Sequence, residues 1–177
     1  NPHQALVLFN SNQALEQVYY ALGRAGLSLD REILAQGITG SAEKITKRFM
    51  LGHDSILLAT SSFIAGVDFP ESALELVVLV QLPFDAPNAL QTRIRYAQLS
   101  AQGINPFKAE ALPKATIKLR QAFGRLIRTP NDRGVFICLD PRLLSTQYGQ
   151  QMRRALPTSL PQKAASVKII RELTDLF

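Results

Sequence analysis

Residues 5–23 read ALVLFNSNQALEQVYYALG, an unbroken apolar run followed by a patterned polar segment. The five apolar residues at 5–9 are typical of a strand that is buried on both faces. A polar turn at residues 10–12 interrupts the run. Apolar side chains then recur at helical spacing, at Leu15, Val18, Tyr19 and Leu22. The stretch therefore predicts a buried strand, a polar turn and an amphipathic helix.

The same alternation continues along the chain. Apolar runs predict further strands at residues 33–35, 55–59, 76–81 and 134–139. Helical patterns lie at 41–50 and in a long region after residue 81, which breaks around 103–107, resumes near 113 and ends before Pro130. Such alternation is typical of a parallel sheet covered on both sides. We predict a three-layer α/β/α domain with a mostly parallel sheet over residues 1–156, and a C-terminal helical tail, residues 157–177, packed on it.

The composition limits the class of protein. The 177 residues include 46% hydrophobic and 19% charged side chains, which are the proportions of a globular domain. A single cysteine, Cys138, excludes an internal disulfide, a zinc finger and a cysteine-ligated iron–sulfur cluster within this segment. Because apolar runs are short and no signal peptide is visible, we expect a cytoplasmic protein without membrane contact. The missing initiator methionine indicates a fragment or a processed chain.

The net charge of +6 is unevenly distributed. Residues 1–92 hold five basic and nine acidic side chains, whereas residues 93–177 hold fifteen basic and five acidic ones. Between positions 93 and 128 the only acidic residue is Glu110. A basic block of this kind is either a solvated helix face or a surface that attracts phosphate groups.

Residues 112–129, LPKATIKLRQAFGRLIRT, give part of this charge a direction. On a helical wheel one side collects Lys114, Lys118, Gln121, Arg125 and Arg128, and the other side is apolar. Gly124 flanks the polar side, and a glycine inside a helix often marks a close approach of another backbone. Arginine suits the binding of a multi-oxygen anion because its guanidinium stays charged and donates two hydrogen bonds at once. Two arginines near one turn of helix can stabilise a phosphoryl group during its transfer.

Polar loops follow three of the predicted strands, at residues 10–12, 60–62 and 140–142. In an open α/β sheet, ligands bind where the carboxyl ends of the strands open into loops. The middle loop continues to Gly66 and Asp68, so hydroxyls, a glycine and a carboxylate lie close together in the sequence. Hydroxyl-rich turns are common, and these loops alone do not identify a ligand.

Several segments together resemble the DinG and XPD-like branch of superfamily 2 DNA helicases. Residues 121–128, QAFGRLIR, resemble motif VI of that branch, residues 57–70, LLATSSFIAGVDFP, its motif V, and residues 5–11, ALVLFNS, its motif IV. RGVFICLDPR at 133–142 and YGQQMRRALP at 148–157 agree as well. The resemblance implies a RecA-like fold and the second of the two motor domains of such a helicase.

The resemblance also implies roles for single residues. Arg125 and Arg128 would be arginine fingers that reach the phosphates of ATP, and Gln121 would sense the γ-phosphate. Gly66, Asp68 and Gly124 would bind ATP or couple it to DNA. Ser11, Thr60 and Ser62 would contact phosphates of single-stranded DNA. The partners implied are single-stranded DNA and the N-terminal motor domain of the same polypeptide.

The chain lacks the motifs that bind the nucleotide itself. The nearest match to a Walker A loop, residues 37–44, has its second glycine and its lysine out of register, and Glu43 would oppose a phosphate. No Asp-Glu pair follows a strand, so Mg²⁺ has no evident ligands. We therefore expect ATP and Mg²⁺ to be held mainly by the first motor domain, along with any iron–sulfur cluster, and the chain alone to be inactive.

Two hypotheses of function remain open from the sequence. The first is the C-terminal motor domain of an ATP-dependent DNA helicase. The second is a nucleic-acid-binding module of a DinG-related exonuclease with little or no motor activity, with which Ala65 is compatible because the family often has glutamate there. A dinucleotide-binding enzyme is disfavoured, because residues 10–13 lack the glycines of its fingerprint.

Overall fold

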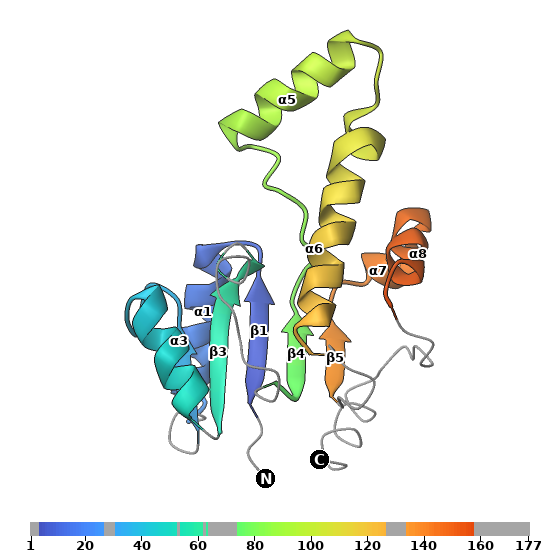
Figure 1. Cartoon of the computed structure of the whole chain (residues 1–177). Coiled ribbons are helices and arrows are strands. Elements are labelled where there is room, and N and C mark those ends of the chain that lie inside the picture. Colours follow the sequence, from blue (N-terminus) through green and yellow to red (C-terminus); the bar gives the residue numbers. More distant parts are fainter. Residues whose placement is uncertain are drawn as a thin grey trace.

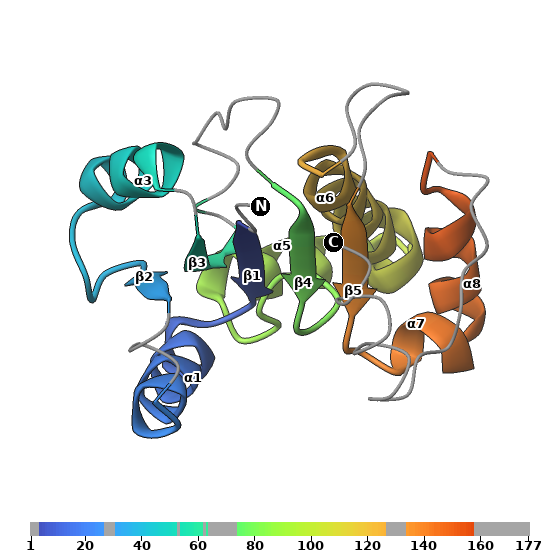
Figure 2. The same cartoon turned by 90° about the horizontal axis from the view of Figure 1, so that it is seen from below.

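The computed structural model describes residues 4–26, 31–52, 54–61, 63, 74–126 and 134–157. They form one five-stranded parallel sheet in the order β2-β3-β1-β4-β5 (Figures 1 and 2). The strands are β1 (Ala5–Phe9), β2 (Glu32–Ala35), β3 (Ser55–Thr60), β4 (Leu76–Leu79) and β5 (Val135–Cys138). All five predicted strands are present, and every pairing is parallel.

The central strands explain the unbroken apolar runs. β1 pairs with β3 on one side and with β4 on the other, so that Leu8 lies beside Ala59 and Leu79. Side chains alternate between the two faces of a strand, and here both faces are covered in the middle of the sheet. Leu6 and Leu57 are completely buried.

The helices lie on both faces of the sheet (Figure 2). They are α1 (Asn12–Arg24), α3 (Ala42–Leu51), α5 (Leu90–Ala101), the π-helical turn η1 (Phe107–Ala111), α6 (Leu112–Gly124), α7 (Arg142–Ser145) and α8 (Gln147–Arg154). α1 packs on one face over the smaller hydrophobic cluster. α3 and α6 pack on the other face, over one larger cluster that they share. The three-layer architecture predicted from the sequence is confirmed.

Local signals set the helix boundaries. The hydroxyl oxygens of Ser11 and Ser41 accept hydrogen bonds from the backbone N–H groups of Ala14 and Lys44, so each serine is an N-cap. The break after α5 coincides with Gly103, whose φ of +74° is in the region that favours glycine. The predicted break at 103–107 is therefore confirmed.

Two helical predictions differ from the structure. The helix expected to run through residue 129 ends at Gly124, and Arg125 is its C-cap. The short helices α7 and α8 were not predicted by periodicity, because they are brief and mostly exposed. The predicted tail at 157–177 falls almost wholly outside the described residues. Within the described part of the chain, no helix is long and apolar enough to cross a membrane.

The loop at residues 140–142 has a structural role. The buried carboxylate of Asp140 accepts a hydrogen bond from the backbone N–H of Leu82, 2.9 Å away, and thereby ties the end of β5 to the end of β4. The guanidinium of Arg142 donates to both oxygens of the same carboxylate. Asn10 donates to the carbonyl of Leu82 at 2.7 Å and ties β1 to the same point.

We predict that Asp140→Ala lowers the free energy of unfolding at pH 7 by about 2 kcal/mol, because it leaves the Leu82 N–H without its partner. Burial would raise the pKa of this carboxyl, but the hydrogen bonds from Arg142 and Leu82 outweigh it and lower the pKa. A lowered pKa means that the stabilisation is complete above the unfolded-state value of about 3.9 and is lost as the pH falls through the folded-state value. Urea unfolding at pH 7 and at low pH measures both effects.

The matched control is Asp54→Ala. Asp54 is an exposed carboxylate paired with Arg31 at 2.5 Å, and exposed ion pairs contribute about 0–1 kcal/mol. Equal losses of stability in the two variants at pH 7 would contradict the role given to Asp140.

Candidate functional site

The residues predicted to be functional lie at two opposite ends of the sheet. Ser11 follows the carboxyl end of β1, and Thr60 is the last residue of the neighbouring strand β3. Gln121 and Gly124 lie in the last turn of α6, which runs antiparallel to the strands and ends near the amino ends of β4 and β5 (Figure 1). From the sequence we expect ligands at the carboxyl ends of the strands. Ser11 and Thr60 lie there, but Gln121 and Gly124 do not.

The end of α6 is fixed by packing. Leu126 is almost fully buried, and its side chain lies against Gly134, the residue before β5. A β-carbon at position 134 would collide with Leu126 and stand 2.9 Å from the carbonyl oxygen of Glu75. The missing side chain of Gly134 therefore allows α6 to close down on the sheet.

This packing positions Gln121 and Arg125 one turn apart. The backbone N–H of Arg125 donates to the carbonyls of Gln121, at 3.2 Å, and Ala122, at 3.3 Å. Gln121 is exposed and Arg125 is partly exposed, while Ala122 and Phe123 face the core. The predicted division of the helix into a buried side and a polar side is confirmed for this turn.

Gly124 differs from the sequence-based expectation. A β-carbon there would meet no atom within 4 Å, so no backbone of the described residues approaches it closely. No atom of the described residues therefore covers the surface beside Gln121 and Arg125 at Gly124. Arg128, Gly66, Asp68 and Ser62 lie outside the described residues.

Part of the predicted basic face is neutralised. Lys114 pairs with Glu110 at 2.6 Å, Arg95 pairs with the same carboxylate at 2.7 Å, and Lys118 pairs with Asp85. Hydrogen bonds from Lys114 and Arg95 lower the pKa of Glu110. The helical wheel did not reveal these pairings, because Asp85 and Arg95 come from outside the helix.

At the other end of the sheet, Ser11 begins α1. Its hydroxyl oxygen accepts the hydrogen bond from the N–H of Ala14 at 3.2 Å, so the hydroxyl proton remains available for a donor contact. Ser11 is exposed, and the first turn of α1 contains no acidic residue. Unpaired backbone N–H groups at the start of a helix bind anions, and phosphate in particular.

Thr60 is bound differently. It is buried, and both its backbone N–H and its hydroxyl donate to Oε1 of Gln36, at 2.9 and 3.0 Å. The hydroxyl proton of Thr60 is therefore already in a hydrogen bond. Thr60 can donate it to a phosphate only if its hydrogen bond to Gln36 breaks. Gln36 was not singled out from the sequence, although its position directly after β2 was the signal that could have identified it.

No group of three His, Cys, Asp or Glu side chains in the described part of the chain is arranged to hold a metal ion. The segment at 37–44 is the loop from β2 to α3, in which Ser41 caps α3 and Glu43 lies in its first turn. A carboxylate at that place opposes an anion. Burial raises the pKa of Cys138, which packs at the edge of the larger hydrophobic cluster as a core residue would.

The model of the helicase C-terminal domain family matches residues 1–159. The chain belongs to this family. The resemblance inferred from the motifs is thereby confirmed, and the match extends across every element of the described sheet.

Curated relatives of this helicase C-terminal domain carry two kinds of name. The chain is 39% identical to the 3'-5' exonuclease DinG of Bacillus subtilis (strain 168) over 155 residues. The matched segment covers 87% of this chain and 17% of that protein. The chain is 43% identical over 127 residues to the ATP-dependent DNA helicase YoaA of Haemophilus influenzae, which covers 72% of this chain and 20% of that protein. The chain thus spans about a fifth of the length of these relatives.

Solved structures place the fold. A structure named XPD helicase superposes with a TM-score of 0.64 at 18% identity, over 86% of this chain and 27% of that chain. A second structure, named XPD apo, gives 0.60 at 20% identity, over 88% of this chain and 32% of that chain. The helicase C-terminal domain described above is therefore a RecA-like α/β domain.

Proposed function

We propose that the chain is the second motor domain of an ATP-dependent DNA helicase and supplies Arg125 to ATP held by the first motor domain. The observation that carries the proposal is the end of α6, where Gln121 and Arg125 lie one turn apart and no described residue packs against the Cα of Gly124. A guanidinium at such a surface can donate to phosphate oxygens presented by another domain. Arg128 is assigned to the same task through its place in motif VI.

The donor set fits the phosphates of ATP, and the chemistry it supplies is electrostatic. When ATP reacts, negative charge accumulates on the transferring phosphoryl group and its oxygens. The guanidinium of Arg125 stabilises that charge. The exposed side-chain amide of Gln121, one helical turn earlier, senses the γ-phosphate. We expect Mg²⁺, which prefers oxygen ligands, to be held mainly by the first motor domain.

Single-stranded DNA is the proposed nucleic-acid partner, and it binds at the carboxyl ends of the strands. Ser11 and the first N–H groups of α1 contact a phosphate there, and Gly66 and Asp68 of motif V connect this end of the sheet with the nucleotide. The support is the free donor capacity at the start of α1 and the absence of acidic residues from its first turn.

We predict that the isolated chain binds an oligo(dT) strand weakly and that the affinity falls as salt rises, because phosphate contacts release counterions. Fluorescence anisotropy with a labelled strand, from low to high salt, measures both. Replacing Gln13, in the first turn of α1, by Glu places a carboxylate beside the proposed phosphate, so affinity falls at low salt. Gln17→Glu, one turn further along the helix, is the matched control. Binding that does not change with salt would contradict the proposed phosphate contacts.

A second function is favoured by one comparison, the identity of 39% to a protein named as an exonuclease. In that case the chain is a nucleic-acid-binding module, and strand degradation by another domain proceeds without ATP. Adding ATP to the full-length polypeptide with a partially duplex DNA separates the two. Strand separation that requires ATP supports the motor, and trimming that ignores ATP supports the module.

A further inference from the structure

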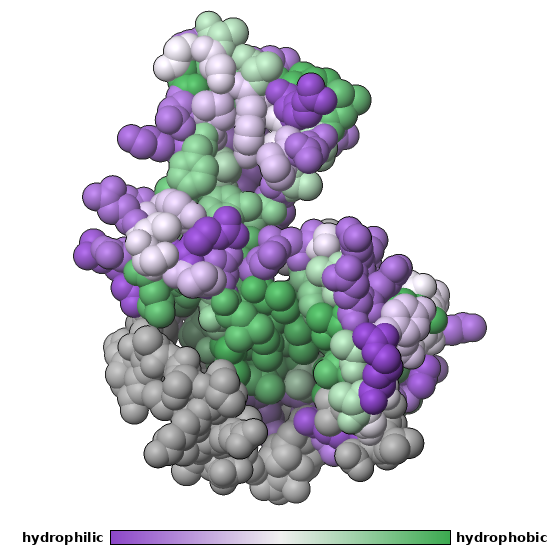
Figure 3. Space-filling model, turned by 180° about the vertical axis from the view of Figure 1, so that it is seen from behind, coloured by the Kyte–Doolittle hydropathy of each residue, from purple (hydrophilic) through white to green (hydrophobic). Residues whose placement is uncertain are grey.

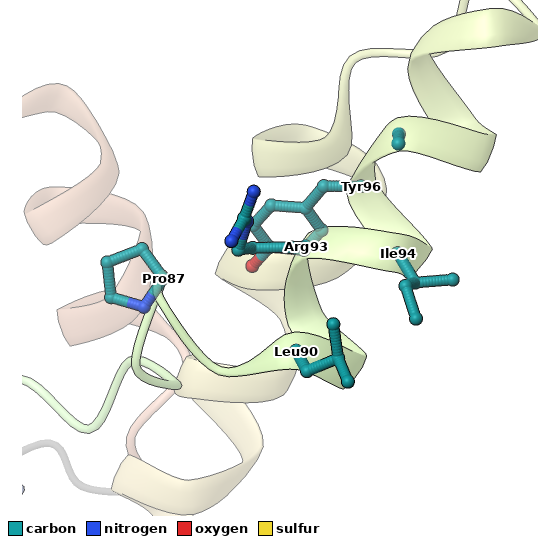
Figure 4. A pocket seen from close by; sticks show the side chains of 6 residues that line it. Pro87, Leu90, Arg93, Ile94 and Tyr96 are labelled. Atoms are coloured by element: carbon teal, nitrogen blue, oxygen red, sulfur yellow. The ribbon is translucent and has the colours of Figure 1, made fainter.

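α5 projects beyond the carboxyl ends of β1 and β3, apart from the layers of the sandwich (Figure 1). Leu90, Ile94 and Ala97 share one side of it, and Leu90 is 69% and Ile94 50% exposed. With Pro87, Arg93 and Tyr96 they line an open hollow of about 510 Å³ (Figure 4). Apolar surface gathered in one place outside the core indicates a binding site.

The charge around this hollow is positive. Asp85 and Glu110, whose charges act on Tyr96, are already paired with the basic residues described above. Arg93 has no acidic partner among the described residues, and it points toward the hollow next to the ring of Tyr96 (Figure 4). The hollow therefore offers one uncompensated cation, one aromatic ring and an apolar floor.

We propose that this hollow binds one nucleotide of single-stranded nucleic acid, with the phosphate on Arg93 and the base against Tyr96 and Pro87. Bases stack on aromatic side chains in such sites, and an arginine contributes to the backbone contact. The site rests on the proposed function and extends it, because α5 lies at the same end of the sheet as Ser11 and the start of α1 (Figure 1). It also gives a role to the start of the basic block after residue 92.

A second hollow of similar size provides the control. It has a volume of about 520 Å³ and is lined by Tyr19, Tyr20, Gly23, Arg24, Glu32 and Ile33. It too combines tyrosine and arginine, but its lining includes the carboxylate of Glu32, which is paired with Arg48 at 2.5 Å, and the hollow lies at the edge strand β2.

The test compares Arg93→Ala and Tyr96→Ala with Arg24→Ala and Tyr20→Ala in the complete 177-residue chain. Affinity for labelled oligo(dT) is measured by anisotropy at several salt concentrations, and folding is checked by melting. We expect Tyr96→Ala to weaken binding on the order of tenfold. Arg93→Ala should weaken it and reduce the slope of log affinity against log salt by about 0.7, the value for one phosphate of a single strand. The control variants should bind as the unaltered chain does.

Each outcome has a separate meaning. If Gln13→Glu weakens binding but Arg93→Ala and Tyr96→Ala do not, the hollow is not part of the surface that binds single-stranded DNA. The proposed function then stands. If the chain does not bind oligo(dT) at any salt concentration, the proposed DNA contacts fail together with the hollow. Binding of an acidic protein segment that depends on Arg93, without binding of oligo(dT), would overturn the assignment to nucleic acid.

A different observation carries a second inference, about the C-terminal tail. On the face of the sheet that α1 covers, α1 packs over β1, β2 and β3, and none of the described helices packs over β4 and β5 on that face (Figure 2). Six apolar side chains point to this side and remain partly or largely exposed: Leu76, Val78, Val80, Val135, Ile137 and Leu139. From behind, this face shows a hydrophobic patch in its centre (Figure 3). A parallel sheet with one face open in this way is unusual.

The sequence of residues 163–177 contains a matching surface. Five apolar residues, Ile169, Ile170, Leu173, Leu176 and Phe177, follow the i, i+1, i+4, i+7, i+8 spacing of one helix side, and basic and acidic residues occupy the other side. We propose that this segment forms a helix that covers β4 and β5.

The test uses the complete chain, with Leu173→Gln on the apolar side and Arg171→Gln on the opposite side as its control. We expect Leu173→Gln to lower the melting temperature by about 5 °C and Arg171→Gln to leave it unchanged. In a Cys138→Ala background, cysteines placed at Ile137 and Leu173 should be joined within one chain by a short bismaleimide. Crosslinks only between chains would show that a second copy covers the face, and equal melting of the two Gln variants without an intrachain crosslink would also overturn the proposal.

Discussion

Arg125→Ala in the full-length polypeptide lowers the turnover number of ATP hydrolysis by about a thousandfold, the scale on which an arginine finger acts. The reason is that the guanidinium interacts with charge that develops during the reaction, so its loss affects the chemical step more than the binding of ATP. Affinity for single-stranded DNA should stay within about twofold, because Arg125 and Ser11 lie at opposite ends of the sheet. Steady-state ATP hydrolysis at saturating DNA measures the first effect, and anisotropy measures the second.

Two further variants make this result specific. Arg125→Lys keeps the charge but loses the planar fork, so only a small part of the activity should return. Arg120→Ala removes an exposed arginine of the same helix, five residues earlier, and should leave turnover unchanged. Normal turnover of Arg125→Ala, or an equal loss in Arg120→Ala, would remove the finger assignment.

Gly149→Ala gives the largest expected loss of stability among the glycines, about 3 kcal/mol. Gly149 is buried in α8 where this helix crosses α7. A β-carbon there would collide with the carbonyl oxygen of Arg142 and stand 2.6 Å from that of Leu143. Both obstacles are backbone atoms, so the two helices must separate to make room. Urea unfolding of the complete chain measures the free energy of unfolding.

Gly23→Ala is the matched control. Gly23 also lies in a helix, but a β-carbon there meets no atom within 4 Å. Alanine is about 1 kcal/mol better than glycine inside a helix, so this variant should be slightly more stable than the unaltered chain. A Gly149→Ala protein as stable as Gly23→Ala would show that α7 and α8 do not pack as closely as described.

The strands could be predicted closely from the sequence, because a strand buried on both faces is a run of apolar residues with no polar interruption. β1 was predicted over residues 5–9 and has those bounds. The end of α6 could not be predicted in the same way. The apolar pattern continues to residue 127, but the chain leaves the helix after Gly124, and Leu126 then packs against Gly134. Such contacts join residues that are far apart in the sequence.

The candidate site shows the same limit. The polar side of α6 was visible on a helical wheel, and the i, i+4 spacing of Glu110 and Lys114 could be read from the sequence too. Only the structure shows that Arg95 also pairs with Glu110 and that Asp85 pairs with Lys118. Likewise, the sequence singles out Thr60 by its place after a strand, but the hydrogen bonds that it gives to Gln36 depend on the pairing of β2 with β3. Spacing along one element can be predicted, whereas partners from other elements require the fold.

The proposed function requires that Arg125 reaches ATP held by the other motor domain. A structure of the full-length polypeptide bound to single-stranded DNA, ADP and aluminium fluoride, which stands for the transferring phosphoryl group, tests it most directly. We expect the guanidinium of Arg125 at roughly 3 Å from a fluoride or a β-phosphate oxygen. A closed complex in which Arg125 faces solvent, with another arginine at the fluoride, would contradict it.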